Sequence, residues 1–209
     1  MTRQEWLEAR KRGLGGSDAA AVLGLNPWKT NVALWEEKTG RREAEDISNK
    51  ECVQYGVACE PLMRDMFKLD FPSLRVSHEE NSIISHQEYP FLKASLDGRL
   101  VDANGSIGVL EIKTTTINRN ADWVQWSSAV PQNYFIQLLH YMLVTEAAFA
   151  ILKARLKKDW GEGLTVTERH YRFDRTDHEA DIAYLLEKEL AFWRLVETDT
   201  RPDLILPEI

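Results

Sequence analysis

The spacing of apolar residues divides the chain into three regions. Up to about residue 70 they recur every three or four positions, which is typical of helices. Between about 74 and 115 they alternate with polar residues, which indicates β-strands. One more helix, two strands and a long final helix are predicted beyond that point. We therefore expect an α/β fold with a central mixed sheet flanked by helices.

A single domain is expected over residues 1–209. Its helical part covers about 1–70, its sheet core about 74–175 and its last helix about 176–199. The alternating pattern predicts six strands: 75–80, 82–86, 91–101, 107–115, 148–157 and 164–173. The last two are expected to join through residues 160–163. A helix over 131–147 is predicted to begin at Pro131.

Helix starts are marked by residues that cap exposed backbone N–H groups. Five residues are predicted to cap helices in this way: Thr2, Ser17, Thr30, Ser48 and Thr176. Gly40 is predicted to stop the helix that begins at Thr30. Pro61 must bend its helix or mark a restart within it, because proline breaks the helical hydrogen-bond pattern.

The composition of the 209 residues is that of an ordinary globular protein, with a formal net charge of −7. This charge argues mildly against a protein that coats nucleic acid, but not against an enzyme that holds DNA through cations and a few arginines. No apolar run approaches the roughly 20 residues of a membrane span, and the first residues do not resemble a signal peptide. We expect a cytoplasmic protein without a membrane partner.

The two cysteines, Cys52 and Cys59, are expected to be free thiols. If their segment is helical, they lie about 10 Å apart along the axis. A disulfide needs Cα atoms within about 7 Å of each other. No cluster of Cys and His residues suggests zinc.

The stretch GVLEIKTTT places two opposite charges in an apolar run. Side chains alternate faces along a strand, so Glu111 and Lys113 share one face while Leu110 and Ile112 point into a core on the other. Asp97 lies on the preceding strand. Carboxylates bind hard cations through oxygen, and a lysine beside such a site can orient the attacking water. This pattern indicates magnesium-dependent phosphodiester cleavage; the alternative is a solvated ion pair on an edge strand.

The connection between the two strands must place Asp97 on the correct face. A two-residue turn at Asn104-Gly105 would put Asp97 opposite Ile112, on the wrong side of the sheet. The site therefore requires an odd-length loop or a bulge. Gly98, Gly105 and Gly108 are candidates to allow it, and we predict such an irregularity here.

Four motifs carry a resemblance to a known family. Asp97, Glu111 and Lys113 form D-x(13)-E-x-K, which resembles the active site of the PD-(D/E)xK nuclease superfamily. LGGSDAAAVLGLNPWKTNVALWEEKTG, YGVACEP and YFIQLLHYMLVT resemble the YqaJ-like viral recombinase family, relatives of phage lambda exonuclease. The motifs occur in family order over roughly residues 6–145. The resemblance implies a restriction-endonuclease-like core.

The resemblance also implies roles for individual residues. Asp97, Glu111 and the backbone carbonyl of Ile112 would bind metal, with Glu60 completing a second metal position. Lys113 would be the catalytic lysine, and Gln137 would lie near the attacking water. A second set would bind the 5′ phosphate and the DNA end: Trp6, Arg10, Ser17 and Tyr134.

As an activity, the resemblance implies a Mg²⁺-dependent 5′-to-3′ exonuclease that digests one strand of linear double-stranded DNA and leaves 3′ overhangs for recombination. Two Mg²⁺ ions, which Mn²⁺ can replace, a homotrimeric ring and a phage single-strand annealing protein as partner are implied. Three alternatives stay open: an endonuclease of the same superfamily, a non-catalytic DNA-end-binding adaptor and a carboxylate-rich phosphatase.

Other polar signals have simpler explanations beside the functional ones. GLGGSD precedes a helix, whose N-terminus can attract phosphate, but it also suits a tight glycine turn. It is not a P-loop because no GK[ST] follows, so no nucleotide cofactor is expected. A basic run is predicted to form a solvated strand edge or, as the minority alternative, to touch DNA: Lys153, Arg155, Lys157 and Lys158. Aromatic residues of the last helix are expected in the core or a subunit contact: Tyr184, Phe192 and Trp193.

Overall fold

The computed structural model describes residues 1–159 and 163–206. Its α-helices are α1 (Arg3–Lys11), α2 (Gly16–Val22), α3 (Asn31–Lys38), α4 (Glu51–Asp70), α5 (Asn120–Ser128), α6 (Gln132–Thr145) and α7 (Glu179–Glu197). Its strands are β1 (Leu14–Gly15), β2 (Arg75–Ser77), β3 (Ile84–Ser85), β4 (Leu92–Ala94), β5 (Gly98–Val101), β6 (Ile107–Ile117), β7 (Phe149–Asp159) and β8 (Leu164–Asp174). A 3₁₀ turn, Arg175–Asp177, precedes α7.

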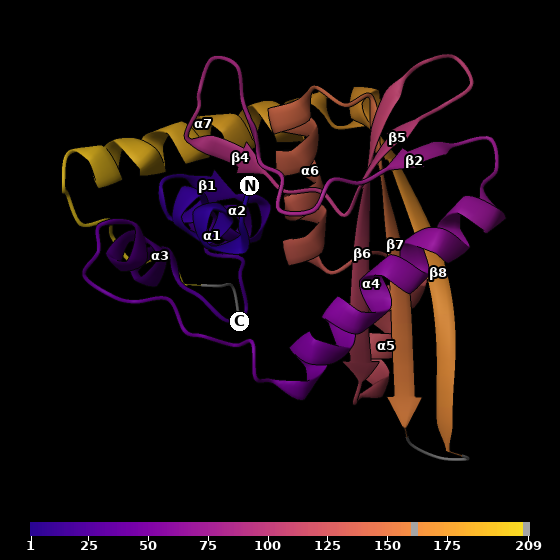
Figure 1. Cartoon of the computed structure of the whole chain (residues 1–209). Coiled ribbons are helices and arrows are strands. Elements are labelled where there is room, and N and C mark those ends of the chain that lie inside the picture. The colour runs from indigo at the N-terminus through magenta and orange to yellow at the C-terminus, as the bar shows by residue number, and fades with distance from the viewer. Residues whose placement is uncertain (160–162, 207–209) are drawn as a thin grey trace.

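The main sheet has five strands in the order β2-β5-β6-β7-β8. β6 and β7 run parallel and the other neighbours antiparallel, which confirms the predicted mixed sheet. Helix α4 covers one face, where Met63 and Phe67 pack on Leu110 and Ile112 (Figure 1). Helix α6 covers the opposite face, on which Val109 lies. Successive residues of β6 thus enter two different cores.

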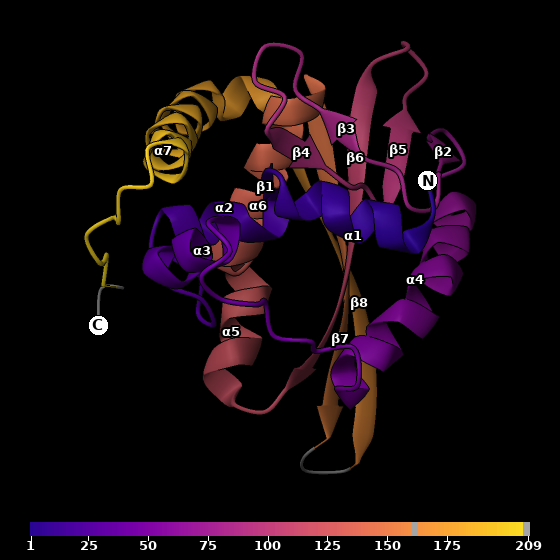
Figure 2. The ribbon, with the colours of Figure 1, turned by 60° about the vertical axis from the view of Figure 1, so that its left-hand side comes forward.

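A smaller sheet, β1-β4-β3, attaches the N-terminal helices to this framework. Leu14 and Gly15 pair in parallel with Leu92 and Lys93. Helix α1 then crosses in front of the main sheet, and α2 packs against α6 (Figure 2). Segments that are distant in sequence, α2 and α6, are therefore neighbours next to β6.

The hairpin between β5 and β6 has the predicted irregularity. Gly98 pairs with Leu110 and Val101 with Ile107. The chain turns through three residues after Asp102, whose backbone N–H donates to the carbonyl of Ser106. Gly105 adopts a positive φ of 85°, a conformation that glycine tolerates best. Continued by one position, this register places Asp97 opposite Glu111.

Two of the five predicted helix caps are confirmed. The Thr2 hydroxyl accepts from the N–H of Glu5 and the Glu5 carboxylate from that of Thr2, and Thr30 caps α3. Three predictions were wrong: Ser17 lies inside α2, and α4 and α7 begin after Lys50 and His178 instead of at the predicted capping boxes of Ser48 and Thr176. The α2 N-terminus is closed instead by Asp18, which accepts from the N–H of Gly15.

The predicted solvated edge at the basic run was also wrong, because β7 lies between β6 and β8 inside the sheet. Lys153 is fully buried, with its Nζ 3.1 Å from Glu168 and 3.5 Å from Asp70. Arg155 donates to the same glutamate and to the hydroxyl of Tyr55. Lys157 lies 3.6 Å from the centroid of the Tyr55 ring, and Lys158 lies 6.0 Å from that of Trp123. A period-two pattern cannot reveal whether a strand has neighbours on both sides.

Other differences concern element boundaries. The pattern gave no indication of α5, and the strand expected over 91–101 divides into β4 and β5 around Asp97. Helix α4 continues through Pro61 without a restart. The predicted connection through residues 160–163 lies largely outside the described residues.

The cysteines and the last helix behave largely as expected. Cys52 and Cys59 are free thiols on α4. On α7, Phe192 is buried and Trp193 stacks on Phe91, whereas Tyr184 is exposed. Within the described ranges, no helix is long and apolar enough to span a membrane.

Candidate active site

Strand β6 and helix α6 build the centre of the candidate site. Glu111 is 3% exposed, and its Oε1 accepts a hydrogen bond of 2.8 Å from Nε2 of Gln137. The same oxygen lies 2.6 Å from Nζ of Lys113. Gln137 also donates to the hydroxyl of Tyr141, one helical turn further on. The E-x-K pair is therefore enclosed by helix α6 and does not form a solvated pair on an edge strand.

Asp97 completes the pair of carboxylates at this centre. It lies directly before β5, and its Oδ2 accepts a 2.7 Å hydrogen bond from the backbone N–H of Ile112. Since Ile112 stands between Glu111 and Lys113, this bond fixes Asp97 beside both. The side chain of Ile112 packs in the core beneath α4, as predicted.

Both carboxylates of this centre have a raised pKa, chiefly because they are buried. Burial raises the pKa of Asp97 to about 8, and the negative charge of Glu111 acts in the same direction against the opposing effect of Lys113. Burial likewise raises the pKa of Glu111. For Lys113, burial alone would lower the pKa, but the carboxylates of Glu111 and Asp97 outweigh it and raise it overall. A buried site with this excess of acid favours an additional positive charge.

Glu60 on α4 approaches the same centre from the other side of β6. Burial raises its pKa, and the Asp97 carboxylate adds to the effect. Arg64, one turn along α4, forms an ion pair with Glu60 and donates from Nε to the backbone carbonyl of Asp97 over 2.6 Å. Arg64 therefore ties the helix-borne acid to the strand that carries Asp97.

The donor set suits a hard divalent cation, although the acids are not arranged as a finished site. Among the described residues, no group of three His, Cys, Asp or Glu side chains is close enough to hold a metal as it stands. However, Oε2 of Glu111 is buried and has no hydrogen-bond partner. A buried, unsatisfied carboxylate oxygen next to a second carboxylate matches the oxygen ligands that Mg²⁺ prefers.

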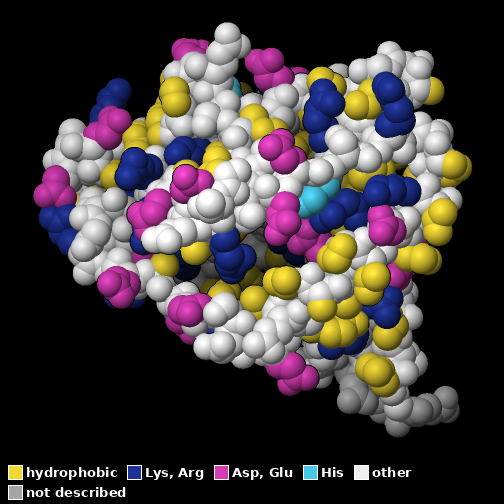
Figure 3. All heavy atoms as spheres, viewed as in Figure 1, with side chains coloured by type: hydrophobic (Ala, Val, Ile, Leu, Met, Phe, Trp, Pro, Cys, Tyr) yellow, Lys and Arg dark blue, Asp and Glu magenta, His cyan; other side chains and the backbone are white. Residues whose placement is uncertain are grey.

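Tyr134 lies near this centre, as its position on α6 predicted. Its ring centroid is 5.1 Å from Nζ of Lys113, within the range of a cation–π contact. Acidic side chains gather on the same face of the molecule as α4, beside a hollow between α4 and the N-terminal helices (Figure 3). The side chain of Lys113 is 22% exposed, so solvent reaches the edge of this centre.

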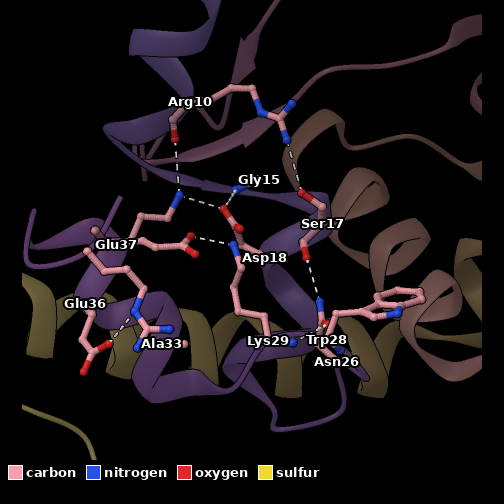
Figure 4. Close-up of polar contacts among 12 residues, drawn as sticks. Arg10, Gly15, Ser17, Asp18, Asn26, Trp28, Lys29, Ala33, Glu36 and Glu37 are labelled. Carbon is pink, nitrogen blue, oxygen red and sulfur yellow. Dashed lines mark hydrogen bonds and ion pairs between the residues drawn. The ribbon is translucent and has the colours of Figure 1, made fainter. Parts of the chain in front are cut away.

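A second cluster forms where α1 approaches α2. An NH₂ group of Arg10 donates to the hydroxyl of Ser17 over 3.3 Å (Figure 4). The guanidinium carbon of Arg10 lies 4.5 Å from the centroid of the Trp6 ring. Trp6 donates from Nε1 to the hydroxyl of Ser95, so its indole is held in place. Arg10 and Ser17 are exposed and could contact an anion together.

Gly16 connects the two clusters. A Cβ at this position would lie 2.6 Å from the ring of Tyr141 and 3.0 Å from Cγ of Gln137. Any residue larger than glycine at position 16 would have to displace the side chains of Tyr141 and Gln137. This close contact supports the interpretation of GLGGSD as a glycine turn required by tight packing. Ser17, the next residue, is therefore adjacent to the side chain that donates to Glu111.

The structure brings the predicted site residues into two adjacent groups. The first holds Asp97, Glu111, Lys113, Gln137 and Tyr134 with Glu60 at its edge, and the second holds Trp6, Arg10 and Ser17. Sequence reasoning missed Arg64, Tyr141 and Ser95. Arg64 and Tyr141 each lie four residues after a predicted site residue, on the same helix face, and that spacing could have indicated them. Ser95 carried no such signal.

Comparisons with known proteins find related sequences and similar folds. The model of the YqaJ-like viral recombinase domain family matches residues 5–148. The uncharacterized protein YqaJ of Bacillus subtilis (strain 168) is 32% identical over 198 residues, which cover 92% of this chain and 56% of that protein. The chain thus spans little more than half the length of this curated relative.

Solved structures share the fold. An alkaline exonuclease of Laribacter hongkongensis, LHK-Exo, superimposes with a TM-score of 0.66 at 20% identity over 94% of this chain and 93% of that chain. A phage related exonuclease of Haemophilus somnus 129PT gives a TM-score of 0.53 at 10% identity over 90% and 96% of the two chains. The mixed sheet flanked by helices is the restriction-endonuclease-like fold of these exonucleases, and the chain belongs to the YqaJ-like viral recombinase family.

Proposed function

We propose that this protein is a metal-dependent nuclease that digests one strand of linear double-stranded DNA from its 5′ end and leaves a 3′ overhang for homologous recombination. The observation that carries the proposal is the convergence of two buried carboxylates and a lysine on one short stretch of sheet. Neutral residues in place of buried charges often give a protein of equal stability. The excess of negative charge at this centre is therefore better explained by function than by folding.

Metal binding would use the acids of this centre. Asp97, Glu111 and the carbonyl of Ile112 would hold one Mg²⁺, and Glu60 would contribute to a second position, with Mn²⁺ as a possible substitute. When bound, the metal would polarise the phosphate and lower the pKa of water. Arg64 must release Glu60 or share it, because the two side chains form an ion pair.

The chain's own residues would position the attacking water. Lys113 presents a charged ammonium group 2.6 Å from Glu111, from where it can donate to a water at the scissile phosphate. Gln137 donates to the same carboxylate oxygen and orients it. Direct hydrolysis in this form needs no covalent intermediate and no nucleotide cofactor.

The 5′ end would be recognised by the second cluster. Arg10 and Ser17 present a guanidinium and a hydroxyl next to each other, and such donors suit a terminal phosphate. Gly16 places this pair beside Gln137, so a nucleotide with its 5′ phosphate at Ser17 would place its 3′ phosphodiester toward Glu111. Trp6 stacks on Arg10 and holds the guanidinium in position.

The comparisons support a nuclease of this kind. The family is one of viral recombinases, and the similar folds belong to proteins described as exonucleases. LHK-Exo has been crystallised with dAMP, a nucleoside monophosphate. A homotrimeric ring around DNA, a phage single-strand annealing protein as partner and a cytoplasmic site of action are part of the proposal.

The proposal is tested with linear duplexes that carry a 5′ phosphate or a 5′ hydroxyl and a label at either end, incubated with Mg²⁺. We expect loss from the 5′ end with preference for the phosphate, release of mononucleotides and survival of a covalently closed circle. Cleavage of the circle would indicate an endonuclease instead. Binding of ends without any cleavage would indicate an adaptor, and attack on free phosphomonoesters a phosphatase.

A further inference from the structure

A large aromatic side chain stands exposed beside the Arg10–Ser17 pair. Trp28, in the loop between α2 and α3, is 74% exposed, whereas Trp35 and Trp126 are buried. Exposure of an indole is costly because of its large apolar surface, and in proteins such side chains often mark a binding surface. This residue takes no part in the two clusters described above.

The backbone around Trp28 is held firmly although its side chain is exposed. The Asn26 side-chain oxygen accepts from the N–H of Trp28 over 2.9 Å and from the N–H of Lys29 over 3.1 Å. Lys29 in turn forms an ion pair of 2.5 Å with Glu37 on α3. The indole is thus presented from a fixed loop, which lowers the entropy that binding would cost.

Asn26 also joins this loop to Ser17 of the Arg10–Ser17 pair. Nδ2 of Asn26 donates to the backbone carbonyl of Ser17 over 3.4 Å. In Figure 4 the guanidinium of Arg10, Ser17 and the indole of Trp28 lie toward one edge of the cluster, and the Glu36 and Glu37 carboxylates toward the other. The side chain of Asn26 therefore links Ser17, which belongs to the phosphate donor pair, to the loop that carries the exposed indole.

We propose that Trp28 forms a stacking subsite for the nucleobase of the 5′-terminal nucleotide, whose phosphate is held by Arg10 and Ser17. The inference rests on the proposed exonuclease activity. Stacking on an indole tolerates all four bases because each has a π face, as a nuclease without sequence preference requires. The subsite would help to separate the terminal base from its partner and hold it during hydrolysis.

The test compares two 5′-phosphorylated duplexes that differ only at the terminal nucleotide, which carries its base in one and is abasic in the other. Single-turnover release of that nucleotide is measured for the wild type, Trp28→Ala and Trp28→Phe. Tyr184→Ala, which removes an exposed aromatic ring from α7, is the matched control. Melting temperatures verify that each variant is folded.

We expect Trp28→Ala to slow release of the base-containing nucleotide by at least about fivefold, the lower end for one base–aromatic stack. The abasic duplex should be released equally slowly by the wild type and this variant, and Trp28→Phe should restore most of the rate. If Trp28→Ala lowered the release rate equally on both duplexes, or on neither, the stacking subsite would be refuted while the exonuclease proposal would stand. If the wild type degrades neither duplex, the exonuclease proposal falls and the subsite with it.

Discussion

The carboxylate of Asp97 accepts a hydrogen bond from the backbone N–H of Ile112, the residue between Glu111 and Lys113. This bond exists because the hairpin turns through an odd number of residues and places Asp97 opposite Glu111. A register shifted by one position would move Asp97 to the face covered by α4. The geometry of the candidate site is therefore decided by the loop at Gly105, eight residues after Asp97 and six before Glu111.

Removal of the lysine amine is expected to stop hydrolysis without unfolding the protein. Lys113→Ala should lower the rate of DNA degradation by about 100-fold or more, the lower end for a positioned proton-transfer group. Lys188→Ala, which removes a surface amine on α7, serves as the control and should keep full activity. Degradation at the wild-type rate by Lys113→Ala would show that another group performs this role.

The acids of the centre should bind a divalent cation in the folded protein. Addition of Mg²⁺ or Mn²⁺ is expected to raise the melting temperature of the wild type, because a ligand that binds only the folded state stabilises it. Asp97→Asn should abolish this rise, whereas Asp65→Asn, at an exposed position on α4, should preserve it. A rise of equal size in Asp97→Asn would place the metal elsewhere.

Without metal, the stability of the protein should depend on pH through Asp97. Its pKa is about 8 in the folded state and near 3.8 when unfolded, so the folded state binds more protons between these values. The free energy of unfolding should therefore fall as the pH rises from about 4 to about 8 and then level off.

The measurement is urea unfolding in the presence of a chelator at several pH values. The Asp97→Asn variant cannot ionise at this position and should show a clearly shallower decline than the wild type. Parallel pH profiles for the two proteins would contradict the raised pKa.

Arg10 should govern the preference for a 5′ phosphate. Loss of a hydrogen bond to a charged group typically corresponds to about a tenfold to hundredfold loss in rate or affinity. Arg10→Ala should therefore reduce degradation of 5′-phosphorylated duplex by about this factor and leave the slow reaction of 5′-hydroxyl duplex nearly unchanged. Arg12→Ala, two positions further on and also exposed, should retain the preference. Equal losses on both duplexes would assign Arg10 to general DNA binding.

Gly16 is expected to tolerate no larger residue. Gly16→Ala would press a methyl group against Tyr141 and should destabilise the protein by about 1–3 kcal/mol, as overpacking commonly does. Gly15→Ala, whose Cβ would lie 3.9 Å from the carbonyl of Lys93, should lose less stability. Urea unfolding of the two variants measures the difference, and a neutral Gly16→Ala would refute the tight contact.

Much of this arrangement could be predicted from local patterns. The alternation around Glu111 assigns its face, and the need to place Asp97 beside it predicts an odd-length hairpin that the structure contains. Thr2 and Thr30 mark helix starts through local hydrogen bonds that sequence spacing reveals.

Features that depend on tertiary contacts were not predictable in this way. The burial of Lys153 follows from its neighbours on both sides of β7 and from α4 above it. The start of α4 at Glu51 and of α7 at Glu179 shows that a capping pattern such as that at Ser48 or Thr176 is not always used. The partnership of Trp6 with Ser95 joins residues almost ninety positions apart.

The contact between Gly16 and Tyr141 also constrains how this family can diverge. A lineage that acquires a bulkier residue at position 16 can keep α2 against α6 only if position 141 becomes smaller in the same interval. The two positions are then expected to covary across homologues, although they lie on different helices and 125 positions apart. Covariation of these two positions would indicate the packing of α2 against α6 from sequences alone.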